Sequence, residues 1–347
     1  MRTIEEDSVA VMSSDIGMPE NTASAQSDDK AIAITLAMRV IDGSFSTIAI
    51  SARDLTAFFA LLSKCHREAS CKNAAAIMAK RLQIDDALRD SLNTFELASC
   101  LASLARWEED EGAFEKAALA LAKRLSIGRV SPGHLNGQAI ANCCVALAKW
   151  HDAPVCKEAC RHLAGRIAAD EAIVRQLNGV RLAICIHALS RWSDDDACRA
   201  AGVRLARRIS EDGNLRHNLN ARYLAVCLDA LAQWPSDDVC RRASVQLARR
   251  ISTDLSVCER LTAKHFINCL KALSTWNDQA ACKAAGMRLV KRLADDGALL
   301  QQLAAARYAG DCMNALNSWP NEEACFRAAA EAVHRHRDAV AHEATVD

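Results

Sequence analysis

The chain has 347 residues, and its 43 Lys and Arg balance its 43 Asp and Glu, so the formal net charge is zero. This balance excludes a protein that binds nucleic acid through bulk positive charge, although it permits a local basic surface. Aromatic residues make up 4% of the chain and Pro occurs 5 times, which argues against a β-sandwich or β-barrel, whereas the frequent Ala, Leu and Arg favour helices.

The first 29 residues show no helical or strand periodicity and are rich in Ser and acidic residues. This composition predicts a disordered leader, 1–29, which is compatible with a type III secretion signal. Acidic residues stand where a Sec signal peptide needs positive charge, and no apolar run reaches the roughly 18 residues that span a bilayer. We therefore expect no Sec export and no membrane partner.

Residues 30–337 form a tandem repeat with a period of 42 or 43 residues. The repeat ends lie near positions 65, 107, 150, 192, 234, 276 and 319, with Cys at the first and Trp at the others: Trp107, Trp150, Trp192, Trp234, Trp276 and Trp319. A Leu recurs three residues before each Trp and a Cys seven residues before it. This recurrence predicts one packing arrangement repeated along the chain, with the Trp in its core.

Each repeat contains two amphipathic helices and a short connecting helix. After Trp192, the apolar residues between 198 and 209 are spaced 3, 1, 3, 1 and 3, which predicts a first helix, helix A. Before Trp234, a second apolar stripe over 224–231 predicts helix B. The expected N-caps of helix B are Asn93, Asn136, Asn178 and Asn220. Between helices A and B, segments that begin with an acid and have room for two helical turns occur at 85–92, 170–177 and 296–303. A last helix A reaches residue 337, and residues 338–347 are predicted to be a flexible tail.

An Arg recurs near the end of helix A, and in five repeats an Asp follows four residues later. The pairs are Arg81 with Asp85, Arg166 with Asp170, Arg208 with Asp212, Arg250 with Asp254, and Arg292 with Asp296. The Arg can bond this Asp or the last carbonyls of helix A, which predicts a structural Arg–Asp ladder. A row of guanidinium groups that binds phosphates is the alternative. On the structural interpretation, Arg208→Ala destabilises the protein by ~1–3 kcal/mol and changes partner binding little.

The 16 Cys residues raise the question of metal binding or disulfides. Twelve of them occupy two recurring core positions, one for each helix, and do not converge as four zinc ligands must. We therefore expect buried, reduced and metal-free thiols, no cofactor, and a reducing compartment.

The exposed side of helix B differs from repeat to repeat. One residue before the repeat end, the first four repeats carry Lys64, Arg106, Lys149 and Arg191; twelve residues before it, three later repeats carry Arg222, Lys264 and Arg307. Charges that serve only solubility should mix signs, so these seven residues are predicted to bind a partner. A variable surface on a constant scaffold is what a binding solenoid needs. An ordinary solvated face is the alternative interpretation.

The period, the helical hairpins and the short third helix resemble the armadillo/HEAT class. This resemblance implies a right-handed α-solenoid of about seven 42-residue repeats, with helix B lining a concave groove. The ends of helix B read Ser63-Lys64-Cys65, Ala148-Lys149-Trp150, Ser190-Arg191-Trp192, Trp234-Pro235 and Ser318-Trp319-Pro320. These sequences resemble the SKWP-repeat family, type III secreted effectors of plant-pathogenic bacteria. The resemblance covers residues 30 to about 337, implies injection into a host cell and an interaction role, and supplies no catalytic residues.

These patterns predict a non-enzymatic scaffold that binds a host protein along its concave face as a virulence effector. One alternative is an RNA-binding protein similar to octotricopeptide repeats, which the zero net charge and scarce aromatic residues disfavour. A second is a purely architectural repeat fragment. No GxSxG, P-loop or HExxH motif occurs, and His336-Arg337-Asp338 spells the kinase triplet without its Asn or Gly-rich loop. We therefore expect no enzymatic activity and no small-molecule substrate.

Overall fold

A computed structural model describes residues 23–45, 47, 50–107, 112–127, 135–304, 308–319 and 324–343. Every regular element in these ranges is an α-helix, which confirms the predicted all-α class. None of these helices combines the length and the apolar composition that crossing a membrane requires. The chain divides into two compact units, residues 1–177 with 194–198, and residues 178–193 with 199–347.

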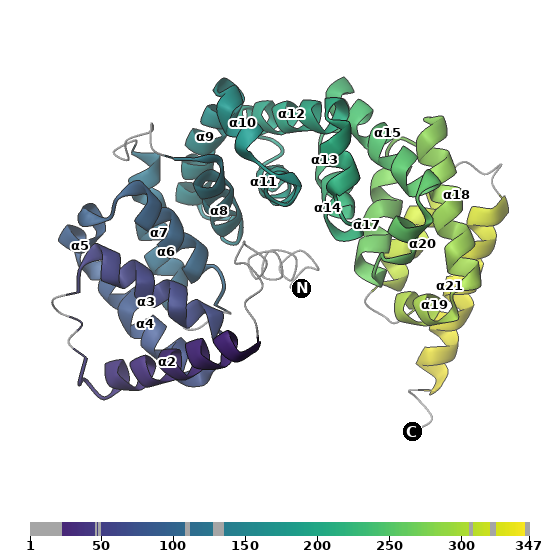
Figure 1. Ribbon diagram of the computed structural model, residues 1–347. Coiled ribbons are helices and arrows are strands. Elements are labelled where there is room, and N and C mark those ends of the chain that lie inside the picture. The colour runs from purple at the N-terminus through teal and green to yellow at the C-terminus, as the bar shows by residue number, and fades with distance from the viewer. Residues whose placement is uncertain are drawn as a thin grey trace. The chain divides into compact units, whose positions relative to one another are not determined.

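Unit 1 contains two layers of helices (Figure 1). The A helices are α2 (Ala23–Ile41), α4 (Ala69–Ile84), α7 (Ala113–Ser126) and α9 (Pro154–Ala169), and each packs on the next. The B helices are α3 (Ala52–Lys64), α6 (Thr94–Leu104) and α8 (Gly137–Ala148), which also pack in order. The short helices α5 (Asp86–Ser91) and α10 (Glu171–Gln176) contact both layers. The sequence period is thus a spatial repeat, because like helices lie against like helices.

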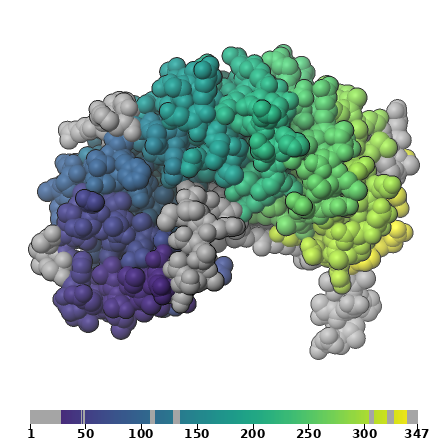
Figure 2. All heavy atoms as spheres, in the orientation of Figure 1, coloured from purple at the N-terminus to yellow at the C-terminus, as the bar shows by residue number. Residues whose placement is uncertain are grey.

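Unit 2 has the same construction. Its A helices are α12 (Asp196–Glu211), α15 (Asp238–Thr253), α18 (Ala280–Asp295) and α21 (Ala324–Glu343). Its B helices are α11 (Gly179–Ser190), α14 (Ala221–Leu231), α17 (Ala263–Ser274) and α20 (Ala309–Asn317). Its short helices are α13 (Gly213–Asn218), α16 (Leu255–Glu259) and α19 (Gly297–Ala304). The B helices pack in order, as do α15, α18 and α21, and side chains close the spaces between neighbouring helices (Figure 2).

Polar side chains begin the helices at the expected positions. Asn93 accepts hydrogen bonds from the backbone N–H groups of Phe95 and Glu96 at 2.9 and 3.0 Å, and Asn136, Asn178 and Asn220 each accept one in the same way. Asp85 begins α5 by accepting from the N–H of Leu88 at 2.8 Å. The matching caps of the other short helices are Asp170, Asp212, Asp254 and Asp296. These caps explain why the helices begin where the sequence predicts, since each satisfies N–H groups that lack an intrahelical partner.

Each Trp follows a B helix, and the indoles of Trp234 and Trp276 bond to the preceding repeat. The N–H of Trp192 donates to the carbonyl of Leu189 at 3.0 Å, and the other five Trp residues make the same contact. Five of the indoles are buried, and that of Trp150 is half-buried. Nε1 of Trp234 donates to the carbonyl of Ser193 at 3.2 Å, one residue after the Trp of the preceding repeat. Each Trp therefore closes its own helix, and Trp234 and Trp276 also bond to the neighbouring repeat, the latter through the carbonyl of Pro235 at 3.3 Å.

The helical region extends further at both ends than the sequence analysis predicts. Helix α2 begins at Ala23, so residues 23–29 of the predicted disordered leader are helical. Asp29 pairs with Lys64 of α3 at 2.7 Å, which gives this end of α2 a tertiary contact. At the other end α21 continues to Glu343, since no Gly or Pro interrupts it, and it includes the first part of the predicted tail. Residues 1–22 and 344–347 lie outside the described residues.

Candidate partner-binding surface

The recurring Arg of helix A joins each repeat to the one before it. Nη1 of Arg292 donates to the carbonyl of Leu261 at 2.9 Å and to that of Cys258, both at the end of α16. Nη1 of Arg250 bonds the carbonyls of Arg216 and Leu219 at the end of α13 in the same manner. The acceptors differ from those expected: the Arg bonds carbonyls at the short helix of the preceding repeat, not the last carbonyls of its own helix A. Each of these guanidinium groups therefore caps a helix C-terminus across a repeat boundary.

The ladder Arg residues also face the Asp residues named with them. Arg81 and Arg292 approach Asp85 and Asp296 to 2.9 and 3.5 Å, and the pairs Arg208–Asp212 and Arg250–Asp254 are separated by 3.8 Å. These four Arg side chains are only 16–20% exposed, so they are poorly placed to receive a phosphate.

Arg166 differs from the other ladder residues. It makes no ion pair with Asp170 in the described part of the chain, and its Nη1 is buried without a hydrogen-bond partner there. Arg250 and Arg292 each bond a carbonyl that lies 34 residues earlier in the chain. The equivalent position for Arg166 is 132, which lies outside the described residues.

The cysteines occupy the core. Cys185, Cys198, Cys227, Cys240, Cys269 and Cys282 are all 0% exposed. Burial raises the pKa of Cys240 and of Cys282 to about 12, so both are protonated near neutral pH. Among the described side chains, no group of three or more His, Cys, Asp or Glu is arranged to hold a metal ion. The side chain of Cys325 lies outside this set.

Thiol modification with dithionitrobenzoate tests this arrangement. Cys65 is half-buried whereas the other described thiols are buried, and burial raises the pKa of Cys65. In a Cys325→Ser background we expect one slow early phase at about pH 8, which accelerates as pH rises because more thiolate forms. The remaining thiols should react only as the protein unfolds. Cys65→Ser should remove the early phase, and rapid modification of several thiols in that variant would contradict the assigned burial.

Lys64 and Lys149 are among the seven basic residues predicted to bind a partner, and both contact other groups of unit 1. Lys64 forms the ion pair with Asp29 described above. Nζ of Lys149 donates to the carbonyl of Ala105 at 3.0 Å and to that of Trp107, at the end of α6, and lies 5.3 Å from the centroid of the Trp150 ring. Lys149 therefore stabilises the C-terminus of the preceding B helix, and a charge reversal there would also remove a helix cap.

The remaining predicted residues have different surroundings. Arg106 and Arg191 are half-buried at the ends of their B helices, and Arg307 lies outside the described residues. Arg222 and Lys264 are half-buried in the first turns of α14 and α17, two helices that pack on each other. The guanidinium of Arg222 lies 5.5 Å from the centroid of the Tyr223 ring.

His265 lies beside these two cations and was not identified from the sequence. Its Nδ1 is 2.8 Å from Oγ1 of Thr262. Burial, followed by the positive charges of Arg222 and Lys264, lowers the pKa of His265 to about 4. The surface around Arg222, Lys264 and His265, which we call the α14/α17 basic surface, thus has a positive potential and a neutral imidazole at neutral pH. One feature of the sequence could have predicted this basic surface: Arg222 and Lys264 occupy the same repeat position in consecutive B helices.

A buried carboxylate at the start of α12 is a second feature that the sequence analysis missed. Asp195 is 4% exposed; its Oδ1 accepts from the N–H groups of Ala197 and Cys198 at 3.0 and 3.1 Å. Its Oδ2 lies 3.0 Å from Nη2 of Arg161. Burial raises the pKa of Asp195, but the hydrogen bonds from Cys198 and Arg161 outweigh it and the net pKa is lowered. Asp195 therefore satisfies the first N–H groups of α12 and pairs with Arg161 of α9, and these contacts lie within unit 1, which includes residues 194–198.

The lowered pKa of Asp195 predicts a specific pH dependence of stability. A carboxylate with a lower pKa in the folded state stabilises the fold above its unfolded pKa of about 3.9, and this contribution is lost as pH falls through the folded value. Asp195→Asn should therefore lower the urea midpoint at about pH 7, and the difference from the parent should shrink towards about pH 3. Asp152→Asn, at a side chain that is 95% exposed, should have little effect at either pH. An Asp195→Asn effect that is constant with pH would exclude this ion pair as its cause.

Comparisons of the chain with protein-family models, curated proteins and solved structures find no match.

Proposed function

We propose that this chain is a non-enzymatic scaffold of about seven armadillo/HEAT-like repeats, wound as a right-handed solenoid, that binds a macromolecular partner through its B helices. The recurring side chains are used inside the scaffold: Trp and Cys in the core, Asn and Asp as caps, Arg between repeats. The exposed residues of the B helices differ between repeats. Such a division between a constant interior and a varying face supports a binding scaffold.

The observation that carries the choice of surface is the position of Arg222 and Lys264 beside His265. Two cations from adjacent repeats share one site at the N-terminal ends of α14 and α17, where helix dipoles add to their positive potential. We therefore propose an acidic protein segment as the ligand. RNA is the second candidate, because a phosphate backbone is also negatively charged. The ring of Tyr223, 5.5 Å from the guanidinium of Arg222, adds an aromatic group to this surface.

The resemblance of the helix ends to SKWP repeats supports a further proposal, that the chain is a virulence effector injected by a type III system into a plant cell. On this proposal the protein acts in the reducing interior of the host cell and binds a host protein. The described cysteines are free thiols and form no disulfides, which is compatible with a reducing compartment. A reporter fused after residue 29 tests the export step, because it should reach host cells only when the type III system is intact.

Affinity purification from plant-cell extract, with and without RNase, tests the binding proposal. The variant Arg222→Glu/Lys264→Glu should lose the partner, whereas Arg242→Glu, at an exposed residue of α15, should retain it. Lys64 and Lys149 are left intact because reversing Lys64 would break its ion pair with Asp29 and reversing Lys149 would remove the cap of α6. Loss of all partners after RNase would favour the RNA alternative.

Retention of the same partner by the double variant would refute this surface. Magnetic resonance titration of His265 gives a second readout, since an anionic ligand should raise its pKa from about 4 towards the ordinary value.

A further inference from the structure

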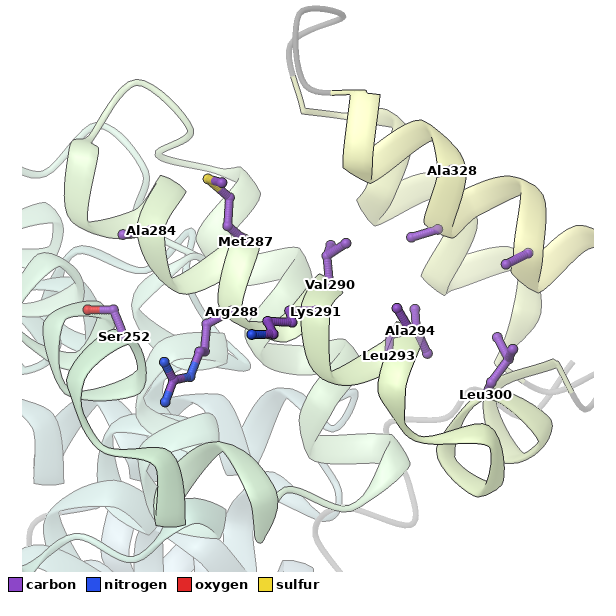
Figure 3. Close-up of a pocket in the computed structure, with 12 residues that line it drawn as sticks. Ser252, Ala284, Met287, Arg288, Val290, Lys291, Leu293, Ala294, Leu300 and Ala328 are labelled. Atoms are coloured by element: carbon purple, nitrogen blue, oxygen red, sulfur yellow. The ribbon is translucent and has the colours of Figure 1, made fainter.

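A groove of about 730 Å³ crosses the outer side of α18 in unit 2. It is bounded by α15 on one side and by α19 and α21 on the other (Figure 3). Val290 of α18 and Ala328 of α21 point towards one another across it, and Leu300 of α19 forms one end (Figure 3). Helix α21 packs mainly on α20 and α19 and less on α18, which leaves this space between two A helices.

The floor of the groove is apolar, and at one of its positions the two preceding repeats carry Ser. Ser210 in α12 and Ser252 in α15 correspond, at intervals of 42 residues, to Ala294 in α18. Ala294 and Ala328 are exposed, and Met287 is 47% exposed at the upper edge. Exposed apolar side chains gathered in one groove are typical of a site that a partner covers.

The two charged side chains that line the groove are both cations. Arg288 and Lys291 extend from α18 towards α15, on the opposite side from α21 (Figure 3). On the α15 side the groove is lined by Ser252. Arg249, one helical turn earlier in α15, is exposed and adds a third positive charge near this side. An occupant must therefore be apolar towards α21 and negatively charged towards α15.

We propose that this groove binds an acidic amphipathic helix of a partner protein. The lining residues of α18 run from Ala284 to Ala294, about 15 Å at the rise of an α-helix, which matches three turns of a helix lying beside it. The small Ala328 and Ala332 of α21 permit close approach of another backbone. Apolar residues spaced three and four apart would contact Met287, Val290 and Ala294, while acids on the flank meet Arg288 and Lys291. This site is separate from the α14/α17 basic surface, so neither proposal depends on the other.

Binding of synthetic helices to the full chain tests the proposal. The probe is a fluorescein-labelled helix of about 18 residues with a Leu face and Glu flanks, and its matched control has Lys flanks. We expect saturable binding of the Glu-flanked probe that shifts the carbon-13 methyl signal of Met287, assigned by its loss in Met287→Leu. Arg288→Glu/Lys291→Glu should weaken this probe by about tenfold or more and favour the Lys-flanked one. Arg242→Glu, with an equivalent charge change outside the groove, should leave binding unchanged.

Several results would overturn the proposal. Equal binding of the two probes would show apolar adsorption without charge selection. An unchanged Met287 signal would place the probe elsewhere, and no saturable binding at millimolar concentration would exclude the helix as occupant. If the double reversal fails to fold, Ala328→Trp blocks the groove from α21, and unaltered affinity in that variant would refute the site.

Discussion

Arg250→Ala is expected to lower the free energy of unfolding by about 2–4 kcal/mol. The side chain is 17% exposed, bonds the carbonyls of Arg216 and Leu219, and lies 3.8 Å from Asp254. Removing it leaves acceptors at the end of α13 without a donor and Asp254 without its cation. The expected loss exceeds that of a surface ion pair, about 0–1 kcal/mol, because the hydrogen bonds to these carbonyls are partly buried. Urea unfolding followed by far-UV circular dichroism measures the change.

The adjacent residue provides a matched control. Arg249 is exposed on the same helix, so Arg249→Ala should change stability by less than about 0.5 kcal/mol. Arg250→Lys keeps the charge but loses the planar fork that reaches several acceptors, so it should recover only part of the loss. If Arg249→Ala and Arg250→Ala were equally destabilising, the capping role would be wrong. If Arg250→Ala preserved stability and abolished partner binding, the phosphate-binding alternative for the ladder would be favoured.

The fold class and the positions of its recurring residues could be predicted because each repeat meets the same physical requirements. An Asn before helix B satisfies free N–H groups, and a Cys or Leu at a fixed distance from Trp fills the same space in every interface. These are local or periodic constraints, so one sequence shows them several times. The beginning of α2 was missed because the stabilising contact, from Asp29 to Lys64, spans two helices.

The surface was harder to predict because exposed residues do not repeat and their contacts are long-range. Lys64 and Lys149 share one sequence position, yet one pairs with Asp29 and the other caps α6. The charge pattern alone could not distinguish these internal roles from partner binding. His265 gave no motif. Its pKa is lowered first by burial and then by the charges of Arg222, on the neighbouring helix α14, and of Lys264, the residue before it in α17. The α18 groove depends on where α21 packs, which no periodicity specifies.

Gly202→Val is expected to destabilise unit 2 by about 3 kcal/mol, although Val is the better helix former. A Cβ atom at Gly202 would lie 2.5 Å from Cη2 and 2.7 Å from Cζ3 of Trp234. Real Cβ atoms almost never lie within 3.0 Å of another heavy atom, so the indole or α12 would have to move. The indole is buried at 3% exposure and bonded to the carbonyl of Ser193, so it has little freedom to shift. Gly202→Ala should have the same sign with a smaller loss, about 1–2 kcal/mol.

Gly165 in α9 is the matched control, because it is also helical but a Cβ there meets no atom within 4 Å. Gly165→Ala should therefore stabilise the protein by about 0.5–1 kcal/mol, opposite in sign to Gly202→Ala. A double-mutant cycle identifies the contact, since Trp234→Leu removes the ring that Gly202→Ala would strike. The combined loss should be smaller than the sum of the single losses by at least about 0.5 kcal/mol. Additive losses would show that the cost of a side chain at Gly202 does not come from a clash with Trp234. The close approach of α12 to the indole of the next repeat would then not be what requires Gly at this position.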